Sequence, residues 1–404
     1  MRREDFPQLQ DRVYGKPLVY LDNAATTQRP RAMVEAMTEA YFHCNANIHR
    51  GVHHLSQEAT RHHEEARQRV ADFLGARSAR EIIFTKGTTD SLNMLAFSIG
   101  EAMVHAGDEI IVSHLEHHSN IVPWQMLAQR KQAHLRVLPL DADLRMDVSQ
   151  LETMLTDRTK LISVAQVSNV LGSIQPVEDI IRLAHAHNIP VCIDGAQSAP
   201  HLPGNVQALG CDFFVCSAHK MYGPTGMGVL YGKEEWLNLL PPAQGGGEMI
   251  EHVRFENTTY NVLPYKFEAG TPDFIGSHAF AAALDYIDRV GRESICAYEQ
   301  ELTRYLETQL LTIPGLTVYA AGTEKAGAVS FNVYHNGQLI HPFDLGTLLD
   351  RQGVAVRTGH HCAEPLIDLL GVPGTVRASL AMYNTREDVD ALITALGRAI
   401  TMLS

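Results

Sequence analysis

Short apolar runs alternate with helical patterns through the first two thirds of the chain. Each run is rich in β-branched or aromatic residues and ends in a polar or glycine-containing turn. The predicted strands are Glu81–Thr85, Glu109–Ser113, Leu161–Val167, Pro190–Ile193, Phe213–Cys216 and Met227–Tyr231. Apolar strands that alternate with helices are typical of a largely parallel sheet covered on both faces. We therefore predict an α/β fold for this part of the chain.

Polar residues cluster directly after these strands. The clusters are Gly87-Thr88-Thr89, Glu116-His117-His118, Ser168-Asn169, Asp194-Gly195 and Ser217–Lys220. Open α/β sheets bind ligands beyond the carboxyl ends of their strands. The shared position of the clusters predicts one binding site at that edge.

The last third of the chain has a different pattern, which predicts a separate α+β domain. Helices are expected at Gly291–Leu311, Pro342–Gln352 and Val389–Leu403, and strands at Ala328–Tyr334, Val354–Arg357 and Val376–Leu380. Thr385–Asp388 resembles a capping box that opens the terminal helix. We expect a large domain at 19–297 and a small domain formed by 1–18 with 298–404. The stretch from Gly245 to Tyr260 looks like a hairpin excursion.

The composition is that of an ordinary globular protein. The 404 residues are 45% hydrophobic and 20% charged, and the formal net charge is −13. A chain of this length favours two domains. Its acidic balance argues against nucleic acid as a partner. No run approaches the roughly 18 apolar residues of a membrane span, and the first residues do not resemble a signal peptide, so we expect a cytoplasmic protein.

The six cysteines are scattered and form no CxxC pair, so a disulfide framework is not expected. Cys192 and Cys216 lie within apolar runs and are expected to be inert core residues. Cys362 instead lies between a histidine pair and Pro365.

Two residues at strand ends have the properties that pyridoxal 5′-phosphate (PLP) chemistry requires. Lys220 offers an amine for a Schiff base. Asp194 follows an apolar strand, where a bare carboxylate is costly unless it pairs with a cation such as a protonated pyridine ring. Asp194 as a helix N-cap is the simpler alternative.

Further residues match the remaining parts of the cofactor. Thr88 and Thr89 open a helical run, which suits a phosphate group, and Ser217 and His219 add donors. His117 is suited to stack on the ring. The ring oxygen has two candidate partners, Asn169 and Gln197.

At this point the sequence resembles a known family. Ser217-Ala218-His219-Lys220 with Gly226 and Gly228 looks like the cofactor-lysine signature of class V aminotransferase-fold enzymes. Other segments resemble the group II cysteine desulfurases, of the SufS type, which are relatives of selenocysteine lyase. These segments are Asp22–Thr27, Asn47–Gly51, Glu116–Trp124, Phe267–Pro272 and Arg357–Ala363.

The resemblance implies a role for each candidate residue. Lys220 would be the Schiff-base lysine, Asp194 the pyridinium partner and Cys362 the persulfide carrier. The other implied roles are ring stacking and proton handling by His117, ring-hydroxyl contact by Gln197, phosphate binding by Thr89, Ser217, His219 and the partner subunit's Thr271, carboxylate binding by Asn169 and Arg377, and pocket lining by Arg357 and His49.

The resemblance also implies a fold and an activity. The fold would be the PLP-dependent transferase fold type I, with a seven-stranded, mainly parallel sheet and homodimeric active sites. The reaction would convert L-cysteine to L-alanine and leave sulfur on Cys362 for iron–sulfur cluster assembly. L-selenocysteine is a possible second substrate. Only Ala363–Val376 separates Cys362 from Arg377, and such a short cysteine loop implies a dedicated acceptor protein of the SufE or SufU type.

Several alternatives stay open at the sequence level. His49 and His53 have the spacing of a zinc pair, but no third ligand is evident, and we expect no metal. Cys362 taken alone is also compatible with a buried core thiol. A different class V reaction, such as transamination or a lyase step, is the main functional alternative. A scaffold for iron–sulfur assembly with structural PLP is a more remote one.

Overall fold

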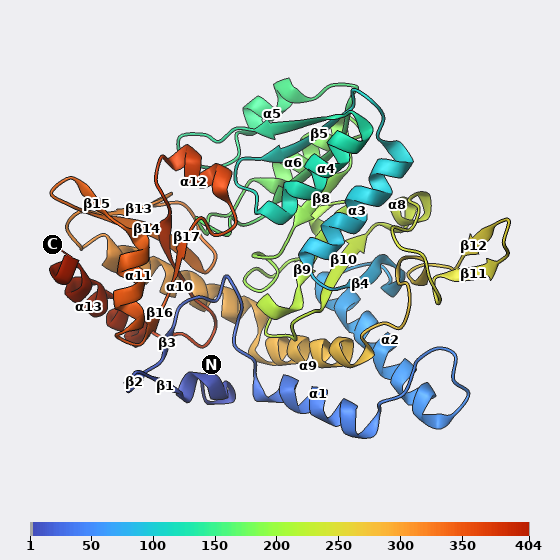
Figure 1. Ribbon diagram of the computed structural model, residues 1–404, viewed down its shortest axis with the longest axis horizontal. Coiled ribbons are helices and arrows are strands. Elements are labelled where there is room, and N and C mark those ends of the chain that lie inside the picture. The colour runs from blue at the N-terminus through green and yellow to red at the C-terminus, as the bar shows by residue number, and fades with distance from the viewer. Residues whose placement is uncertain (1–2, 404) are drawn as a thin grey trace.

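The computed structural model describes residues 3–403 and has an α/β architecture built around a seven-stranded sheet (Figure 1). The strands in spatial order are β4 (Ile82–Thr85), β10 (Gly228–Gly232), β9 (Phe213–Ser217), β8 (Val191–Asp194), β7 (Thr159–Ala165), β5 (Glu109–Ser113) and β6 (His134–Leu138). The four pairings from β9 to β6 are parallel, whereas β10 runs antiparallel to both of its neighbours. The predicted mainly parallel sheet is confirmed.

Side chains of each strand alternate between two apolar clusters, one on each face of the sheet. In β8, Cys192 belongs to one cluster, and Val191 and Ile193 belong to the other. The helices that contribute to the cluster of Val191 are α1 (Arg31–His43), α2 (His54–Leu74), α5 (Val148–Met154), α6 (Val177–Ala186), α7 (Val206–Leu209), α9 (Phe274–Val290), the first part of α10 (Arg292–Leu310) and α12 (Glu364–Leu370). The cluster of Cys192 receives α3 (Thr88–Met103), α4 (Val122–Lys131) and α8 (Glu234–Leu239). Burial on both faces explains why these strands are continuously apolar in sequence.

A second sheet lies in the C-terminal part of the chain and is antiparallel throughout. Its strands are β13 (Leu316–Val318), β14 (Ala328–His335), β18 (Thr375–Ser379) and β17 (Arg357–Gly359), with β15 (Gln338–Ile340) also paired to β14. It shares an apolar cluster with α10 (Arg292–Leu310), α11 (Pro342–Asp350) and α13 (Arg386–Leu403). This is the α+β pattern predicted for the last third.

The structure adds short strands that the sequence did not suggest. The predicted strand Val354–Arg357 is split into β16 (Val354–Ala355) and the start of β17, because β16 pairs in parallel with β3 (Val19–Tyr20). Arg12–Val13 (β1) and Lys16–Pro17 (β2) form a small hairpin. The stretch after Gly247 is a hairpin as predicted, with β11 (Ile250–Val253) and β12 (Thr258–Tyr260), and it projects away from the second sheet (Figure 1).

The exact division into domains stays a prediction. Phe6 and Leu9, from the segment assigned to the small domain, pack in the same cluster as the large sheet. Within residues 3–403, none of the helices has the length and apolar character needed to cross a membrane.

Candidate active site

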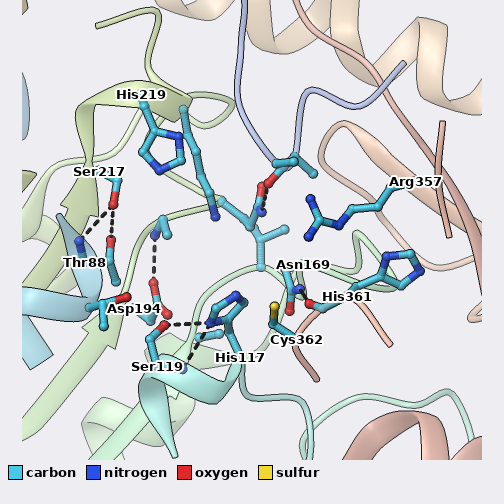
Figure 2. A pocket seen from close by; sticks show the side chains of 18 of the residues that line it. Thr88, His117, Ser119, Asn169, Asp194, Ser217, His219, Arg357, His361 and Cys362 are labelled. Carbon is cyan, nitrogen blue, oxygen red and sulfur yellow. Dashed lines mark hydrogen bonds between the residues drawn. The ribbon is translucent and has the colours of Figure 1, made fainter. Parts of the chain in front are cut away.

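A cavity of about 180 Å³ lies where the carboxyl ends of the large sheet meet the second sheet (Figure 2). Its lining includes every predicted site residue except His49 and Thr271. These residues are Thr88, Thr89, His117, Asn169, Asp194, Gln197, Ser217, His219, Lys220, Arg357, Cys362 and Arg377. Most of them come from the strand ends and following loops of the large sheet. Arg357 comes from β17, Cys362 from the turn after β17, and Arg377 from β18.

Asp194 is the last residue of β8, and Lys220 follows the adjacent parallel strand β9, which places both groups at one edge of the sheet. Burial lowers the pKa of Lys220 to about 8, although the charge of Asp194 opposes this shift. Burial raises the pKa of Asp194, while a hydrogen bond from the Ala196 amide and the charge of Lys220 lower it. The lowered pKa therefore increases the fraction of Lys220 that is an uncharged, nucleophilic amine near neutral pH.

The N-terminus of α3 faces the same cavity and has no side-chain cap. Its N-cap, Gly87, has a φ of 149°, and a Cβ on Gly228 would overlap the Gly87 backbone. The Thr88 amide donates to Ser217 Oγ at 2.8 Å, and the two hydroxyl oxygens are also 2.8 Å apart. The backbone amides and neighbouring hydroxyls at a helix N-terminus form a suitable phosphate site.

His117 follows β5 and is held by Ser119. The Ser119 amide donates to His117 Nδ1 at 3.1 Å, and Ser119 Oγ lies 2.7 Å from the same nitrogen. Burial, with a further contribution from the charge of Lys220, lowers the pKa of His117 to about 3. Because Nδ1 accepts a hydrogen bond, the proton of the neutral ring is on Nε2.

Arg377 is buried and only partly satisfied. Its Nη1 donates to the Asn169 carbonyl at 2.7 Å, and its Nη2 contacts Asp22 Oδ1 at 3.2 Å. Its Nε is buried without a hydrogen-bond partner among residues 3–403. Arg357 Nη1 lies 4.0 Å from the other Asp22 oxygen. Two arginines that share one carboxylate leave positive charge for an anionic group.

Cys362 lies in a turn between β17 and α12 and is half-buried, close to His117 and Asn169 in Figure 2. His361 precedes it and lines the cavity as well. Its Nε2 lies 2.8 Å from Thr375 Oγ1, and its buried Nδ1 has no partner among the described residues. Burial lowers the pKa of His361 to about 2, so its ring is neutral.

Two predicted residues lie outside this cavity. Thr271 is exposed, and the prediction that it serves a partner subunit stays a prediction. His49 lies between Glu64 and Glu248, with 2.9 Å from a ring nitrogen to each carboxylate, and these carboxylates raise its pKa. Its suggested zinc partner His53 caps α2 instead.

Sequence reasoning assigned no individual site role to Asp22 and Ser119. Asp22 belongs to a segment that carried the family resemblance, so the signal was present, but its partner Arg377 comes from a distant strand. Ser119 required the geometry of the turn after β5, which the sequence pattern does not define.

The observed donor set fits PLP. Lys220 offers an amine, Asp194 offers a buried carboxylate, and the N-terminus of α3 lies beside the Ser217 hydroxyl. The absence of a Cβ at Gly228 allows the backbone to close around the phosphate end. The unpartnered Arg377 Nε provides an additional donor for an amino acid carboxylate.

Comparisons with known proteins agree with this geometry. Residues 19–392 match the family described as Aminotransferase class-V. A cysteine desulfurase of Enterobacter sp. (strain 638) is 49% identical over 397 residues, which cover 98% of this chain and 97% of the relative. A cysteine desulfurase of Escherichia coli (strain SE11) is 48% identical over 402 residues, covering 99% and 98%.

Solved structures give the same assignment. The cysteine desulfurase CsdA from Escherichia coli superposes with a TM-score of 0.92 at 40% identity, covering 100% of this chain and 98% of that chain. A cysteine desulfurase from Thermococcus onnurineus NA1 superposes with a TM-score of 0.92 at 39% identity, with the same coverage. The chain therefore belongs to the class V aminotransferase family, within its PLP-dependent cysteine desulfurases.

Proposed function

We propose that the protein removes sulfur from L-cysteine, releases L-alanine and retains the sulfur as a persulfide on Cys362. The observation that supports this most directly is the position of Cys362, which lines the same cavity as Lys220, Asp194 and Arg377. A transaminase requires no nucleophilic thiol at this place, so the cysteine favours desulfuration over the alternative class V reactions.

In the proposed site, Lys220 and Asp194 hold the cofactor. When bound, PLP supplies an aldehyde that condenses with amines and a ring that accepts electrons from the substrate Cα. Lys220, with its lowered pKa, is suited to take and return a proton near neutral pH. The remaining proposed contacts are Thr88, Thr89, Ser217 and His219 with the phosphate, His117 with the ring face and Gln197 with the ring oxygen.

Arg377 is proposed to bind the substrate carboxylate. Its unpartnered Nε and its Nη2, which now contacts Asp22, form one edge of the guanidinium group and can address both carboxylate oxygens. Arg357 adds positive charge at the rim, and one amide hydrogen of Asn169 remains for the same carboxylate because the other is bonded to the His361 carbonyl. Fixing the carboxylate orients the substrate sulfur relative to Cys362.

Sulfur transfer then uses Cys362 as a thiolate. Its Sγ forms an S–S bond with the substrate sulfur while the substrate carbon–sulfur bond breaks, and the electron pair of that bond stays with carbon. A proton completes L-alanine, and His117, whose Nε2 bears the ring proton, is a donor inside the cavity.

The proposed biological role follows from the proposed reaction and from the family resemblance. We infer a homodimer in the cytoplasm that passes persulfide sulfur to an acceptor protein of the SufE or SufU type for iron–sulfur cluster assembly. L-selenocysteine would fit the same cavity, and its weaker carbon–selenium bond would depend less on Cys362.

Alanine and sulfide production from L-cysteine, with a reductant present, tests the proposal. We expect wild type to release both products, and Lys220→Ala and Cys362→Ala to release neither. Cys296→Ala, which changes another half-buried cysteine, is the matched control and should retain activity. Normal alanine and sulfide release by Cys362→Ala would refute the persulfide role and direct the search to selenocysteine and keto-acid substrates.

A further inference from the structure

The turn that presents Cys362 has a backbone conformation that requires support from the surrounding structure. His361 and Cys362 are consecutive non-glycine residues with φ values of 53° and 57°. The left-handed region costs an L-residue about 1–2 kcal/mol. Such a pair persists when surrounding contacts hold it in place.

Three hydrogen bonds from loops of the large sheet reach this turn. The His118 amide donates to the Cys362 carbonyl at 2.7 Å, and Asn169 Nδ2 donates to the His361 carbonyl at 2.7 Å. The Glu364 amide donates to His118 Nε2 at 3.0 Å. His118 therefore contacts the turn twice, once through its backbone at the Cys362 carbonyl and once through its ring at the Glu364 amide.

The ring contact supplies a cap that the local sequence lacks. Glu364 is the first residue of α12, and the preceding Ala363 has no side chain that can accept a hydrogen bond. The first amides of a helix have no intrahelical partner and need an acceptor from outside the helix. Here His118, which follows β5, provides the acceptor across the boundary between the two sheets.

We propose that His118 is a positioning residue that holds the Cys362 turn in its strained conformation at the cavity. Only the expected effect on sulfur transfer rests on the proposed function. Its structural content is that the imidazole acceptor at Nε2 fixes the start of α12 and, with it, the position of Sγ. His117, the adjacent histidine, faces the cavity and has a different set of partners.

The test compares His118→Ala with His118→Gln in the PLP-loaded protein. Glutamine places a carbonyl oxygen near the position of Nε2 and can accept the same bond, whereas alanine cannot. Exposed His335, at the end of β14, gives the control variant His335→Ala. The direct measurements are hydrogen exchange of the Glu364 amide and the rate of iodoacetamide alkylation at Cys362, with half-buried Cys44 and Cys296 as references in the same chain.

In His118→Ala we expect Glu364 exchange and Cys362 alkylation to increase about 2- to 10-fold, the range that corresponds to one lost hydrogen bond. Alkylation of Cys44 and Cys296 should not change. The kcat for alanine formation should fall by a similar factor, while the KM for L-cysteine and the cofactor absorbance stay at wild-type values. His118→Gln should recover most of each loss.

Unchanged exchange and alkylation in His118→Ala would overturn the proposal, as would equal defects in the alanine and glutamine variants. Both measurements are independent of turnover. A wild-type protein that fails to desulfurate cysteine would therefore refute the proposed function while the result for the turn still stands.

Discussion

Arg377 Nε is the clearest unsatisfied donor in the cavity at the level of single residues. A buried donor without a partner costs about 1–3 kcal/mol, and a bound carboxylate would remove that cost. The ion pair with Asp22 satisfies only part of the guanidinium group. The charge of Arg377 is therefore held in place before substrate arrives, and the fork of the side chain stays available.

Replacing Arg377 with lysine should separate charge from geometry. Lysine keeps the positive charge but cannot form two parallel hydrogen bonds to a carboxylate. We expect the KM for L-cysteine to rise about tenfold or more in Arg377→Lys, with a smaller change in kcat, measured by alanine formation. Arg357→Lys is the matched variant and should have a weaker effect, because the Arg357 side chain is 42% exposed. Equal effects of the two substitutions would contradict the assignment of Arg377 as the main carboxylate ligand.

At the scale of elements, β10 and the start of α3 approach each other so closely that there is no room for a side chain at Gly228. Gly228 lies against the Gly87 backbone, and Gly87 precedes Thr88 and Thr89. We expect Gly228→Ala to displace the α3 N-terminus and to raise the dissociation constant of PLP about tenfold, measured by cofactor absorbance during dialysis.

A second glycine provides the control for this experiment. Gly397 lies in α13 with open space around its Cα and an ordinary helical conformation. Alanine there should leave PLP binding unchanged and stabilise the fold by about 0.5–1 kcal/mol. PLP retention by Gly228→Ala at the wild-type level would show that the contact does not shape the phosphate site.

The sequence predicted elements best where burial on both faces makes a strand continuously apolar. Glu109–Ser113 was predicted with the boundaries that β5 has, β8 is shifted by one residue from its prediction, and β9 is one residue longer than predicted. Short strands were missed because they form only by pairing with segments that are far away in the sequence. β3 and β16 have two residues each and exist through their pairing with one another.

Side-chain candidates were predictable at strand ends, where topology alone gathers them. Lys220 and Asp194 belong to this group. The parts that escaped prediction are contacts between segments far apart in the chain, such as the bond from Glu364 to His118 and the pairing of Arg377 with Asp22. These contacts depend on how the second sheet packs against the large sheet, and no local sequence pattern encodes that arrangement.

At the scale of the whole molecule, buried neutral histidines link stability to pH. His63 in α2 accepts a hydrogen bond from Arg67 Nη2 at 3.0 Å, and its Nδ1 lies 2.8 Å from Ser277 Oγ. Burial, with a further contribution from the charge of Arg67, lowers its pKa to about 3. The unfolded chain binds a proton at this histidine below about pH 6.5, and the folded chain does not. Stability is therefore lost as the pH falls from about 6.5 toward 3.

The substitution His63→Gln removes this titration and keeps a hydrogen-bond acceptor for Arg67. Between pH 7 and pH 5, we expect the free energy of unfolding to fall by about 2 kcal/mol less in His63→Gln than in wild type, measured by urea unfolding at both pH values. His105→Gln changes an exposed histidine and should behave as wild type. An identical pH dependence of the unfolding free energy in His63→Gln and wild type would contradict the link between His63 protonation and stability.

The dimer is a further prediction at this scale. Thr271 is exposed and lies outside the cavity of its own chain, so it can contact PLP only through a second subunit. We expect sedimentation to give a dimer, and Thr271→Ala to weaken PLP retention severalfold, a loss comparable to one hydrogen bond to a charged group. Thr312→Ala, at another exposed threonine, should have no effect. A monomer that retains PLP normally would remove the basis for this role.

The pairing of Arg377 with Asp22 joins residues 355 positions apart in the chain. A ribosome synthesises a protein from its N-terminus, so Asp22 emerges long before its partner exists. The lysine and phosphate side of the cavity can take shape earlier, because β4 to β10 precede the second sheet. Cofactor capture can therefore begin on the nascent chain, but the carboxylate pocket is completed only when translation is nearly finished.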